Sequence, residues 1–530
     1  MVRTRCGRWL AGLLLATLCL TFSARKGQAL DLTIGLASET TSLDPHFYNS
    51  SSNGNQLLHL YDRLVISAPD DPAKNLPQLA LSWRLVDETT WEFSLRHDVT
   101  FHDGTPFTAD DVIFTIQRIP TVKNSPASFI TYVKHIAKIE RTDDYTLRIQ
   151  TTEAYPFLLA DLGLIPIVSR KLHAEATTGD FNSGRLALGT GPYRLIRWMP
   201  GDAMELARNP DWWGPQQPWD RVLMRPIASD PARLAALLSG SVDLIEQVAI
   251  ADLPRVRADP RLALVSVPGF RVMYLFPDST RDTPPWLFDE HGHELVRNPL
   301  KDVRVRRAIS MAIDRRAIVD RIMDGEAGAA NQLCSPACGG GAHELEPIAY
   351  DPEAARRLLT EPGYPNGWSM TLHGLKGATA NDDKVALSVA QYLNRIGIAV
   401  SVEALPINVF GPRATAREYS FILSYFDAGF AAYSLRMTMM TYDTAKGQGV
   451  FNRMRYSNPD VDRLAGAALT TLDDVARDRL TAEAMTVAMR DVALIPLISV
   501  NNTWAVRRER LSFTGALAAR TVAMYATPAR

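Results

Sequence analysis

Cysteine is scarce in this chain of 530 residues, which contains four. Two of them fall within the first 29 residues, so only Cys334 and Cys338 lie beyond, in the turn-rich segment CSPACGGG. Their spacing is CxxxC, whereas a thioredoxin-like dithiol is CxxC beside a strand–helix–strand unit. The sequence therefore predicts a structural disulfide between Cys334 and Cys338, or two idle thiols, rather than redox chemistry.

Long apolar runs are missing beyond the N-terminus, so no later stretch predicts a membrane-spanning helix. The N-terminus itself has the parts of a secretory signal peptide: three arginines, an apolar run over 9–22, and small residues before Ala29, after which we expect cleavage. Residues 1–29 hold five basic and no acidic side chains, so their removal takes the formal charge from −1 to −6. Because phosphate contacts need clustered Lys and Arg, no nucleic-acid partner is expected.

Catalytic signatures are also missing from the sequence. It contains no GxSxG, no GxxxxGK[ST] and no HExxH. His97 and His102 lie on a strand-and-turn path that points them to opposite faces, and the adjacent Asp110 and Asp111 do not face each other on a helix. We therefore expect no enzyme, no metal site and no cofactor.

The clearest local structure lies between residues 95 and 116. Apolar residues before 100 fit a buried strand, and the sequence HDGTP is dense in turn residues. Thr108 and Asp111 have the spacing of a capping box, which predicts a helix beginning there. A second, amphipathic helix is expected over 53–64.

Strand and helix patterns alternate through the rest of the chain. A strand at 222–227, a helix at 230–239 and a strand at 242–245 predict a parallel crossover, which indicates an α/β lobe. The same alternation from about 285 to 495 predicts a second α/β lobe, and residues 61–188 form a separate compact α+β unit. Two lobes joined by crossing strands form a cleft, and an exported chain without catalytic residues is typical of a ligand-binding module that closes on its ligand.

Six stretches, in this order, carry a family resemblance: TSLDPH (41–46), FHDGTPFTADDVIFTI (101–116), GTGPY (189–193), ALLSGSVDLI (236–245), NPLKDVRVRRAISMAIDR (298–315) and RYSNPDVD (455–462). Together they resemble the family 5 extracellular solute-binding proteins, which are the periplasmic dipeptide- and oligopeptide-binding components of ABC importers. The resemblance covers essentially the whole mature chain.

The resemblance implies a two-lobed α/β periplasmic binding protein of the cluster C type with an inserted α+β domain. It implies a periplasmic monomer that captures a peptide or similar small solute between domains I and III and delivers it to the membrane permease of an ABC importer. The implied divisions are a signal peptide at 1–29, domain I at 30–60, 189–285 and 500–530, domain II at 61–188, and domain III at 286–499.

The binding residues of the family are only partly matched. In its peptide binders, a strand resembling residues 421–426 ends in a Trp-x-x-Asp pattern whose aspartate takes the α-ammonium group of the ligand. Here Asp427 matches the aspartate, Ser424 stands in place of the tryptophan, and the usual following Asp-Pro is absent. The resemblance makes Asp427 a candidate amine partner, and the alternative is a solvated turn aspartate. Further candidate ligand contacts are Tyr425, Phe426, Phe430, Phe47 and Tyr48.

Two other functions stay open. An exported peptidase or other hydrolase would need a nucleophile–base pair or a metal cluster, and the sequence offers neither. A protein that keeps the fold could instead be a receptor or chaperone for a non-peptide ligand, because the segment 424–430 departs from the peptide-binding pattern.

Overall fold

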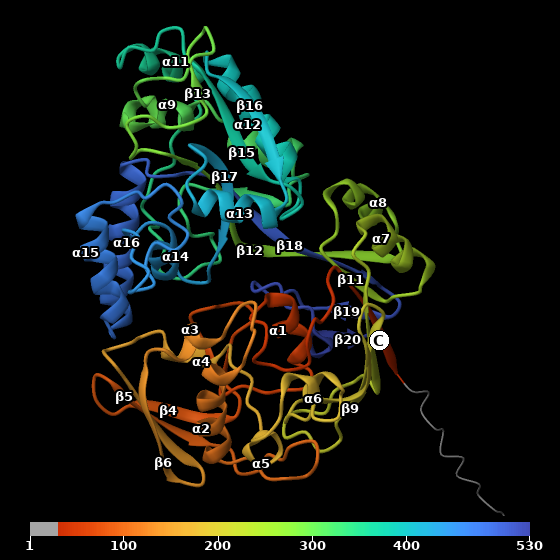
Figure 1. Ribbon diagram of the computed structural model, residues 1–530. Coiled ribbons are helices and arrows are strands. Elements are labelled where there is room, and N and C mark those ends of the chain that lie inside the picture. Colours follow the sequence, from red (N-terminus) through yellow and green to blue (C-terminus); the bar gives the residue numbers. More distant parts are fainter. Residues whose placement is uncertain (1–29, 530) are drawn as a thin grey trace, which may run out of the picture.

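The computed structural model describes residues 30–529, which form an upper and a lower lobe (Figure 1). The upper lobe is the continuous stretch 278–494, and the lower lobe holds residues 30–261 and 508–529. The two strands between these stretches join the lobes. The predicted signal peptide lies outside the described residues. Within residues 30–529, no helix is long and apolar enough to cross a membrane.

One twelve-stranded sheet runs through both lobes, in the order β13-β15-β17-β12-β18-β11-β1-β10-β9-β8, with β14 beside β18 and β16 beside β15. The strands are β1 (Asp31–Leu36), β8 (Tyr193–Met199), β9 (Ala203–Arg208), β10 (Arg221–Pro226), β11 (Leu244–Glu246), β12 (Leu262–Pro277), β13 (Leu287–Phe288), β14 (Ala327–Ala329), β15 (Ser369–Leu375), β16 (Ala399–Leu405), β17 (Phe421–Asp427) and β18 (Ile495–Arg507).

The predicted strand–helix–strand unit is present in the lower lobe. Strands β10 and β11 flank β1, both parallel to it, and α7 (Asp230–Ser239) connects them. Gly240 ends α7 at a φ of 78°, a left-handed conformation that suits glycine. The crossover prediction is confirmed, and the structure adds that the first strand of the chain lies between the two strands of the unit.

The segment around residues 95–116 builds a four-stranded antiparallel sheet and the helix beside it. The sheet order is β4 (Ala80–Leu85), β5 (Thr90–Leu95), β7 (Thr146–Thr151) and β6 (Ile136–Asp143). The predicted cap is confirmed, because the Thr108 amide donates to Asp111 Oδ2 over 2.8 Å where α2 (Ala109–Arg118) begins. His102 is buried, and its backbone amide donates to the carbonyl oxygen of Gly189 over 2.8 Å. The turn therefore anchors the unit to the segment GTGPY.

The helix predicted over 53–64 is shorter than expected. The structure ends α1 (Ser51–Leu57) seven residues earlier, because the chain beyond it bonds to the GTGPY segment instead. The carbonyl oxygen of Leu60 accepts from the Gly191 amide over 2.9 Å, and a Cβ on Gly189 would lie 2.0 Å from the same oxygen. Glycine at these positions lets two backbones approach more closely than side chains permit.

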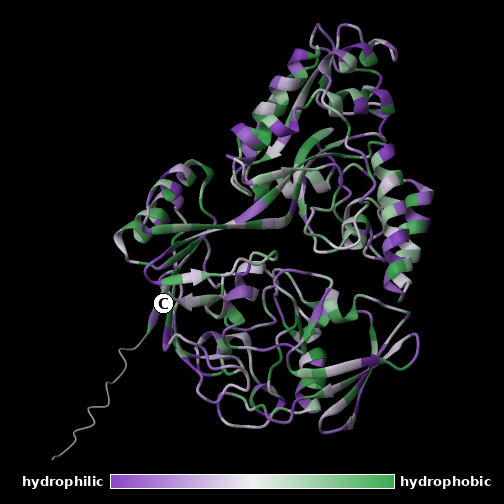
Figure 2. Ribbon diagram, turned by 180° about the vertical axis from the view of Figure 1, so that it is seen from behind, coloured by the Kyte–Doolittle hydropathy of each residue, from purple (hydrophilic) through white to green (hydrophobic). Residues whose placement is uncertain are grey.

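The upper lobe repeats the α/β pattern. Strands β15 and β16 are parallel and are connected by α12 (Asp382–Arg395). Along the outer edge of this lobe, helix turns alternate between hydrophilic and hydrophobic residues in Figure 2, as expected where one face packs on a core. The larger helices of the lobe are α9 (Val303–Met311), α10 (Arg315–Arg321), α11 (Pro352–Thr360), α13 (Ile407–Thr415), α14 (Ala431–Thr438), α15 (Pro459–Thr470) and α16 (Asp474–Arg490).

The remaining α-helices and strands are short and lie in the lower lobe. They are β2 (Val65–Ser67), β3 (Asn75–Pro77), α3 (Ile130–Val133), α4 (Leu158–Leu162), α5 (Arg170–His173), α6 (Thr178–Asn182), α8 (Leu253–Ala258), β19 (Leu511–Phe513) and β20 (Ala526–Pro528). Helices α1, α3 and α4 lie at the top of this lobe, below α14 of the upper lobe (Figure 1).

Strands β12 and β18 pair with each other and carry the chain between the lobes. Their antiparallel register shifts between Pro268 and Val272, near the middle of β12. A Cβ on Gly269 would lie 2.5 Å from the carbonyl oxygen of Val500, so the two backbones approach too closely there for a side chain. The connection is therefore a two-stranded ribbon with an irregular midpoint.

We expect Gly269→Ala to lower the free energy of unfolding by about 1–3 kcal/mol, since the added methyl group must displace the backbone of β18. Chemical denaturation measures the change. Gly411→Ala in α13 is the matched control, because a Cβ there meets no atom within 4 Å. It should stabilise the protein by about 0.5–1 kcal/mol. Equal effects from both substitutions would contradict the close approach at Gly269.

Candidate functional site

Asp427 ends β17 and is already engaged in an ion pair. Arg271 on β12 donates to it through Nε to Oδ1 over 2.9 Å and through Nη2 to Oδ2 over 2.7 Å. The Arg271 side chain is 32% exposed and that of Asp427 is 45% exposed. The aspartate is therefore neither free nor simply solvated, and an incoming ammonium group has to compete with a guanidinium group for it.

Arg271 and Tyr425 complete a cluster around Asp427. The guanidinium carbon of Arg271 lies 4.3 Å from the centre of the Tyr425 ring, and its Nη1 donates to the carbonyl oxygen of Ala378 over 3.2 Å. Burial opposes the charge of Arg271, but the ion pair with Asp427 outweighs it, so the pKa of Arg271 is raised. The cluster offers a carboxylate and a guanidinium group side by side.

Phe426 and Phe430 differ in what they contact. The Phe426 ring packs within the upper lobe, 6.1 Å from Tyr433 and 5.4 Å from Phe451 between ring centres. The Phe430 ring reaches the lower lobe and meets Phe157 edge-on, with ring centres 5.7 Å apart. Phe430 is thus the predicted ligand contact that lies where the two lobes meet.

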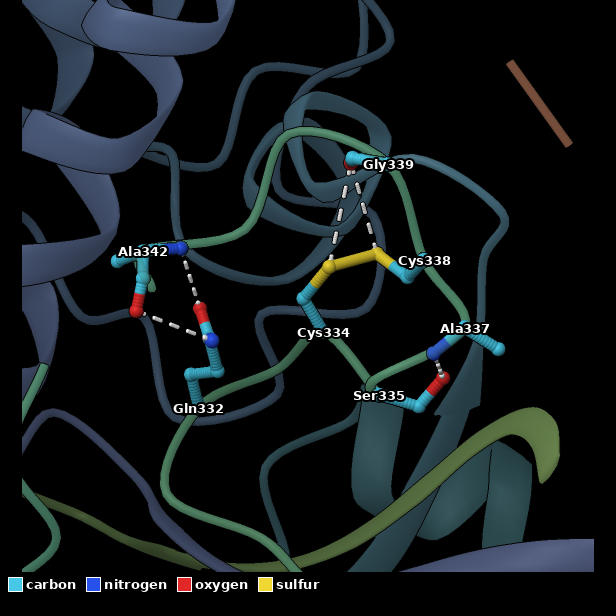
Figure 3. The surroundings of a disulfide bond; sticks show 7 residues. All are labelled: Gln332, Cys334, Ser335, Ala337, Cys338, Gly339 and Ala342. Carbon is cyan, nitrogen blue, oxygen red and sulfur yellow. Dashed lines mark hydrogen bonds between the residues drawn. A yellow bond between two sulfur atoms is a disulfide. The ribbon is translucent and has the colours of Figure 1, made fainter. Parts of the chain in front are cut away.

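The disulfide loop holds the backbone around Phe430. Cys334 and Cys338 are bonded with their Cα atoms 5.5 Å apart, beside Gly339 (Figure 3). The Gly339 amide donates to the carbonyl oxygen of Gly429, and the Ala431 amide donates to the carbonyl oxygen of Gly339, both over 2.9 Å. The loop therefore brackets Phe430 on both sides and fixes the direction in which its ring leaves the upper lobe.

Phe47 and Tyr48 lie in the lower lobe with partners of their own. The carbonyl oxygen of Phe47 accepts from Ser125 Oγ over 2.7 Å, and Tyr48 forms a β-bridge with Ala127. No hydrogen bond or ring contact within residues 30–529 joins either side chain to Asp427. The structure thus brings Arg271 together with Asp427 and Tyr425, and it joins neither Phe47 nor Tyr48 to that cluster by such a contact.

A group of ionisable residues lies where the lobes meet, and no sequence motif predicts it. Asp161 in α4 accepts from the Tyr155 hydroxyl over 2.7 Å, and burial raises its pKa to about 7. The hydrogen bond and the positive charges of Arg436 and Lys134 oppose that rise. Arg436 belongs to α14 of the upper lobe and Lys134 follows α3 of the lower lobe. An aspartate inside the apolar run FLLADLGLIPIV is the one feature that could have drawn attention to this place.

The upper lobe also contains a cavity, which lies away from this region. A cavity of about 1010 Å³ lies in the upper lobe between α16 and residues 340–348, and its wall holds four arginines and four carboxylates. It includes none of the predicted ligand contacts. Residues 30–529 contain no group of three His, Cys, Asp or Glu side chains placed to hold a metal ion.

Comparisons with known proteins all match solute-binding proteins. The model of the bacterial extracellular solute-binding proteins, family 5, middle region, matches residues 75–448. The glutathione-binding protein GsiB of Salmonella paratyphi A is 28% identical over 506 residues, which is 93% of each chain. The probable D,D-dipeptide-binding periplasmic protein DdpA of Escherichia coli is 26% identical over 498 residues, or 91% of each chain.

Solved structures share the fold. The periplasmic binding protein DppA of Helicobacter pylori, in complex with the peptide STSA, has a TM-score of 0.75 and 22% identity over 94% of this chain and 98% of its own. The substrate-binding protein CtaP of Listeria monocytogenes has a TM-score of 0.80 and 22% identity over 94% and 99%. The predicted two-lobed α/β architecture is therefore confirmed.

We expect replacement of both Cys334 and Cys338 by serine to lower the free energy of unfolding by about 2 kcal/mol, because the closed loop is short and its entropic contribution is modest. Denaturant titration with and without a reductant measures this. Reductant should destabilise the native protein and leave the double serine variant unchanged. Free thiols in the native, unreduced protein would contradict the disulfide.

Asp161 predicts a pH dependence of stability. Its folded pKa of about 7 lies above the unfolded value near 3.8, so its contribution is fully present below the unfolded pKa and is lost as the pH rises through 7. We expect Asp161→Asn to remove this loss. Relative to the variant, the native protein should become less stable between pH 4 and pH 8, as measured by urea titration. A difference that is constant with pH, or that grows in the opposite direction, would contradict the assignment.

Proposed function

The chain belongs to the bacterial extracellular solute-binding proteins of family 5, and from this membership we propose that it is the substrate-binding component of an ABC importer for a peptide or a similar small zwitterionic solute. The observation that carries the proposal is the segment 427–430, because Phe430 meets Phe157 of the lower lobe and Asp427, three residues earlier, is paired with Arg271. The family is defined by binding rather than by catalysis. The relatives that bind glutathione or dipeptides support a peptide-like ligand.

The ribbon of β12 and β18 supports a closure mechanism. We propose that residues 30–60, 189–285 and 500–530 act as domain I, with 61–188 inserted as domain II, and that 286–499 turn against them as domain III. Two lobes joined by a narrow ribbon can rotate about it while their cores stay rigid. The ligand is then enclosed between the lobes and held out of water until the permease receives it.

Asp427 and Arg271 form the proposed polar end of the binding site. Without a ligand the two side chains neutralise each other, and a zwitterionic ligand can replace that ion pair with two of its own. The ligand ammonium group then binds Asp427, and Tyr425 and Phe430 contact its apolar part. Phe426, Phe47 and Tyr48 stay proposed contacts. The exchange buries little unpaired charge, because each ion keeps a partner of opposite charge.

The proposal places the mature protein in the periplasm as a monomer. It rests on the signal peptide predicted at 1–29 and on relatives described as periplasmic. The partners it implies are the permease subunits of the importer.

A thermal-shift screen of di- and tripeptides, each with its N-acetylated counterpart, tests the proposal. Binding to the native state raises the melting temperature by mass action. We expect free peptides to bind, and Asp427→Asn to weaken them tenfold or more, because a charge-assisted hydrogen bond contributes about 1.5–3 kcal/mol. The same variant should bind the N-acetylated peptides as the native protein does.

Asp98→Asn is the matched control, because Asp98 lies on the exposed surface of the lower lobe. It should leave both affinities unchanged. Unchanged affinity for free peptides in Asp427→Asn would remove Asp427 from the site. Hits from non-peptide solutes alone would favour the receptor or chaperone alternative, and turnover of a peptide would favour a hydrolase.

A further inference from the structure

Two cationic side chains face each other where the lobes meet. Lys134 of the lower lobe and Arg436 of the upper lobe both point at Gly447, a residue of the upper lobe. If Gly447 had a Cβ, it would lie 2.8 Å from Lys134 Nζ and 3.5 Å from Arg436 Nη2. The space between the two cations is thus the space that a side chain at 447 would fill. Gly447 has a φ of 63°, which favours glycine at this position.

Neither cation has an anionic partner. Arg436 is buried, with 7% of its surface exposed, and among the described residues its guanidinium group donates only to the carbonyl oxygens of Gly447 and Lys446, each over 3.3 Å. Within residues 30–529 no carboxylate forms an ion pair with Arg436 or Lys134. Buried arginines are normally paired with an anion, because an unpaired buried charge is costly. The Lys134 side chain is exposed, so the place is open to solvent from its side.

The neighbouring ionisable groups leave the place positive. Burial, reinforced by Arg436 and Lys134, lowers the pKa of His135 to about 4, so it is neutral at pH 7, and its ring stacks on Tyr155. Burial, followed by the charge of Arg436, lowers the pKa of Lys134. The charge of Asp161 partly offsets this lowering of the Lys134 pKa, and the hydrogen bond from Tyr155 occupies one carboxylate oxygen of Asp161. Tyr433, on the upper lobe, contributes only a neutral hydroxyl group, because burial raises its pKa to about 12.

We propose that Lys134 and Arg436 form an anion-binding site shared between the lobes, which takes a carboxylate group of the bound solute. Each lobe supplies one cation, so the complete site exists only when the lobes are closed. Closure without a ligand brings two like charges together, whereas closure on a carboxylate gives both of them a partner. The site therefore selects acidic solutes and couples their binding to closure. The identity of the ligand as a peptide-like solute rests on the proposed function, but the electrostatic coupling does not.

The first experiment needs no ligand. Dyes are attached at Val475→Cys in α16 and Glu88→Cys in the lower lobe, both on exposed positions, and energy transfer reports the distance between the lobes. At low ionic strength we expect the double variant Lys134→Gln with Arg436→Gln to be more closed than the native protein. Salt should remove the difference, because it screens the repulsion. Equal distances at low ionic strength would overturn the proposal.

Lys138→Gln with Arg463→Gln is the matched control, because it removes one lysine from the lower lobe and one arginine from the upper lobe at exposed positions. This control should leave the distance unchanged. A melting curve of each variant establishes that it is folded before the distances are compared.

The second experiment uses tripeptides that end in Glu or in Gln. Each is tested as the free acid and as the C-terminal amide. We expect the amide and Gln members to bind the native protein at least tenfold more weakly, and the double Gln variant to bind all members alike. Gly447→Ala keeps both charges but fills the space between them, so it should also lose the preference. Equal binding of acids and amides by the native protein would overturn the site. If no peptide binds, the proposed function fails, and the ligand-free distances decide the anion site alone.

Discussion

The pairing of β12 with β18 is the constraint on which the rest of the structure depends. Within residues 30–529 these two antiparallel strands carry every backbone crossing between the lobes, and β12 also pairs with β17 while β18 also pairs with β11. Their hydrogen bonds set where the lobes can lie, and the shift in register between Pro268 and Val272 marks where the ribbon is least regular. The segment that ends at Asp427 is positioned by the same pairing, since β17 lies directly beside β12. A change in the ribbon therefore changes the proposed hinge and the proposed binding residues together.

In the proposed closure, charge at the meeting surfaces supplies the selectivity. Asp427 and Arg271 neutralise each other across the neighbouring strands β17 and β12, whereas Lys134 and Arg436 lie on different lobes and repel each other. The first pair can exchange partners with a ligand at little electrostatic cost. The second gains a partner only from outside the protein. Charge-assisted bonds strengthen as water is excluded, so a ligand that satisfies both pairs is favoured most in the closed state.

Local features of the fold could be predicted from the sequence, and long-range ones could not. The capping box at Thr108, the parallel crossover through α7 and the two α/β lobes follow from residue spacing over a few turns, and the structure has all of them. The predicted end of α1 was wrong, because the carbonyl oxygens that would continue the helix bond instead to residues more than 120 positions away. Asp427 could be found by resemblance, but its partner Arg271 is 156 positions away on a strand whose register no pattern reveals. Lys134 and Arg436 carry no motif at all, and only the approach of the lobes gives them a common role.

The upper lobe is one uninterrupted stretch of chain, whereas the lower lobe is built from both ends of the sequence. Its core is completed by the last residues: Trp219 Nε1 donates to the carbonyl oxygen of Ala526 over 2.8 Å, and the Ala523 amide donates to His59 Nε2 over 3.0 Å. The contacts that complete the lower lobe therefore span 307 and 464 positions, whereas the upper lobe packs from one continuous stretch of chain. Contacts between residues far apart require large loops to close first, so we expect the lower lobe to complete its core more slowly than the upper lobe.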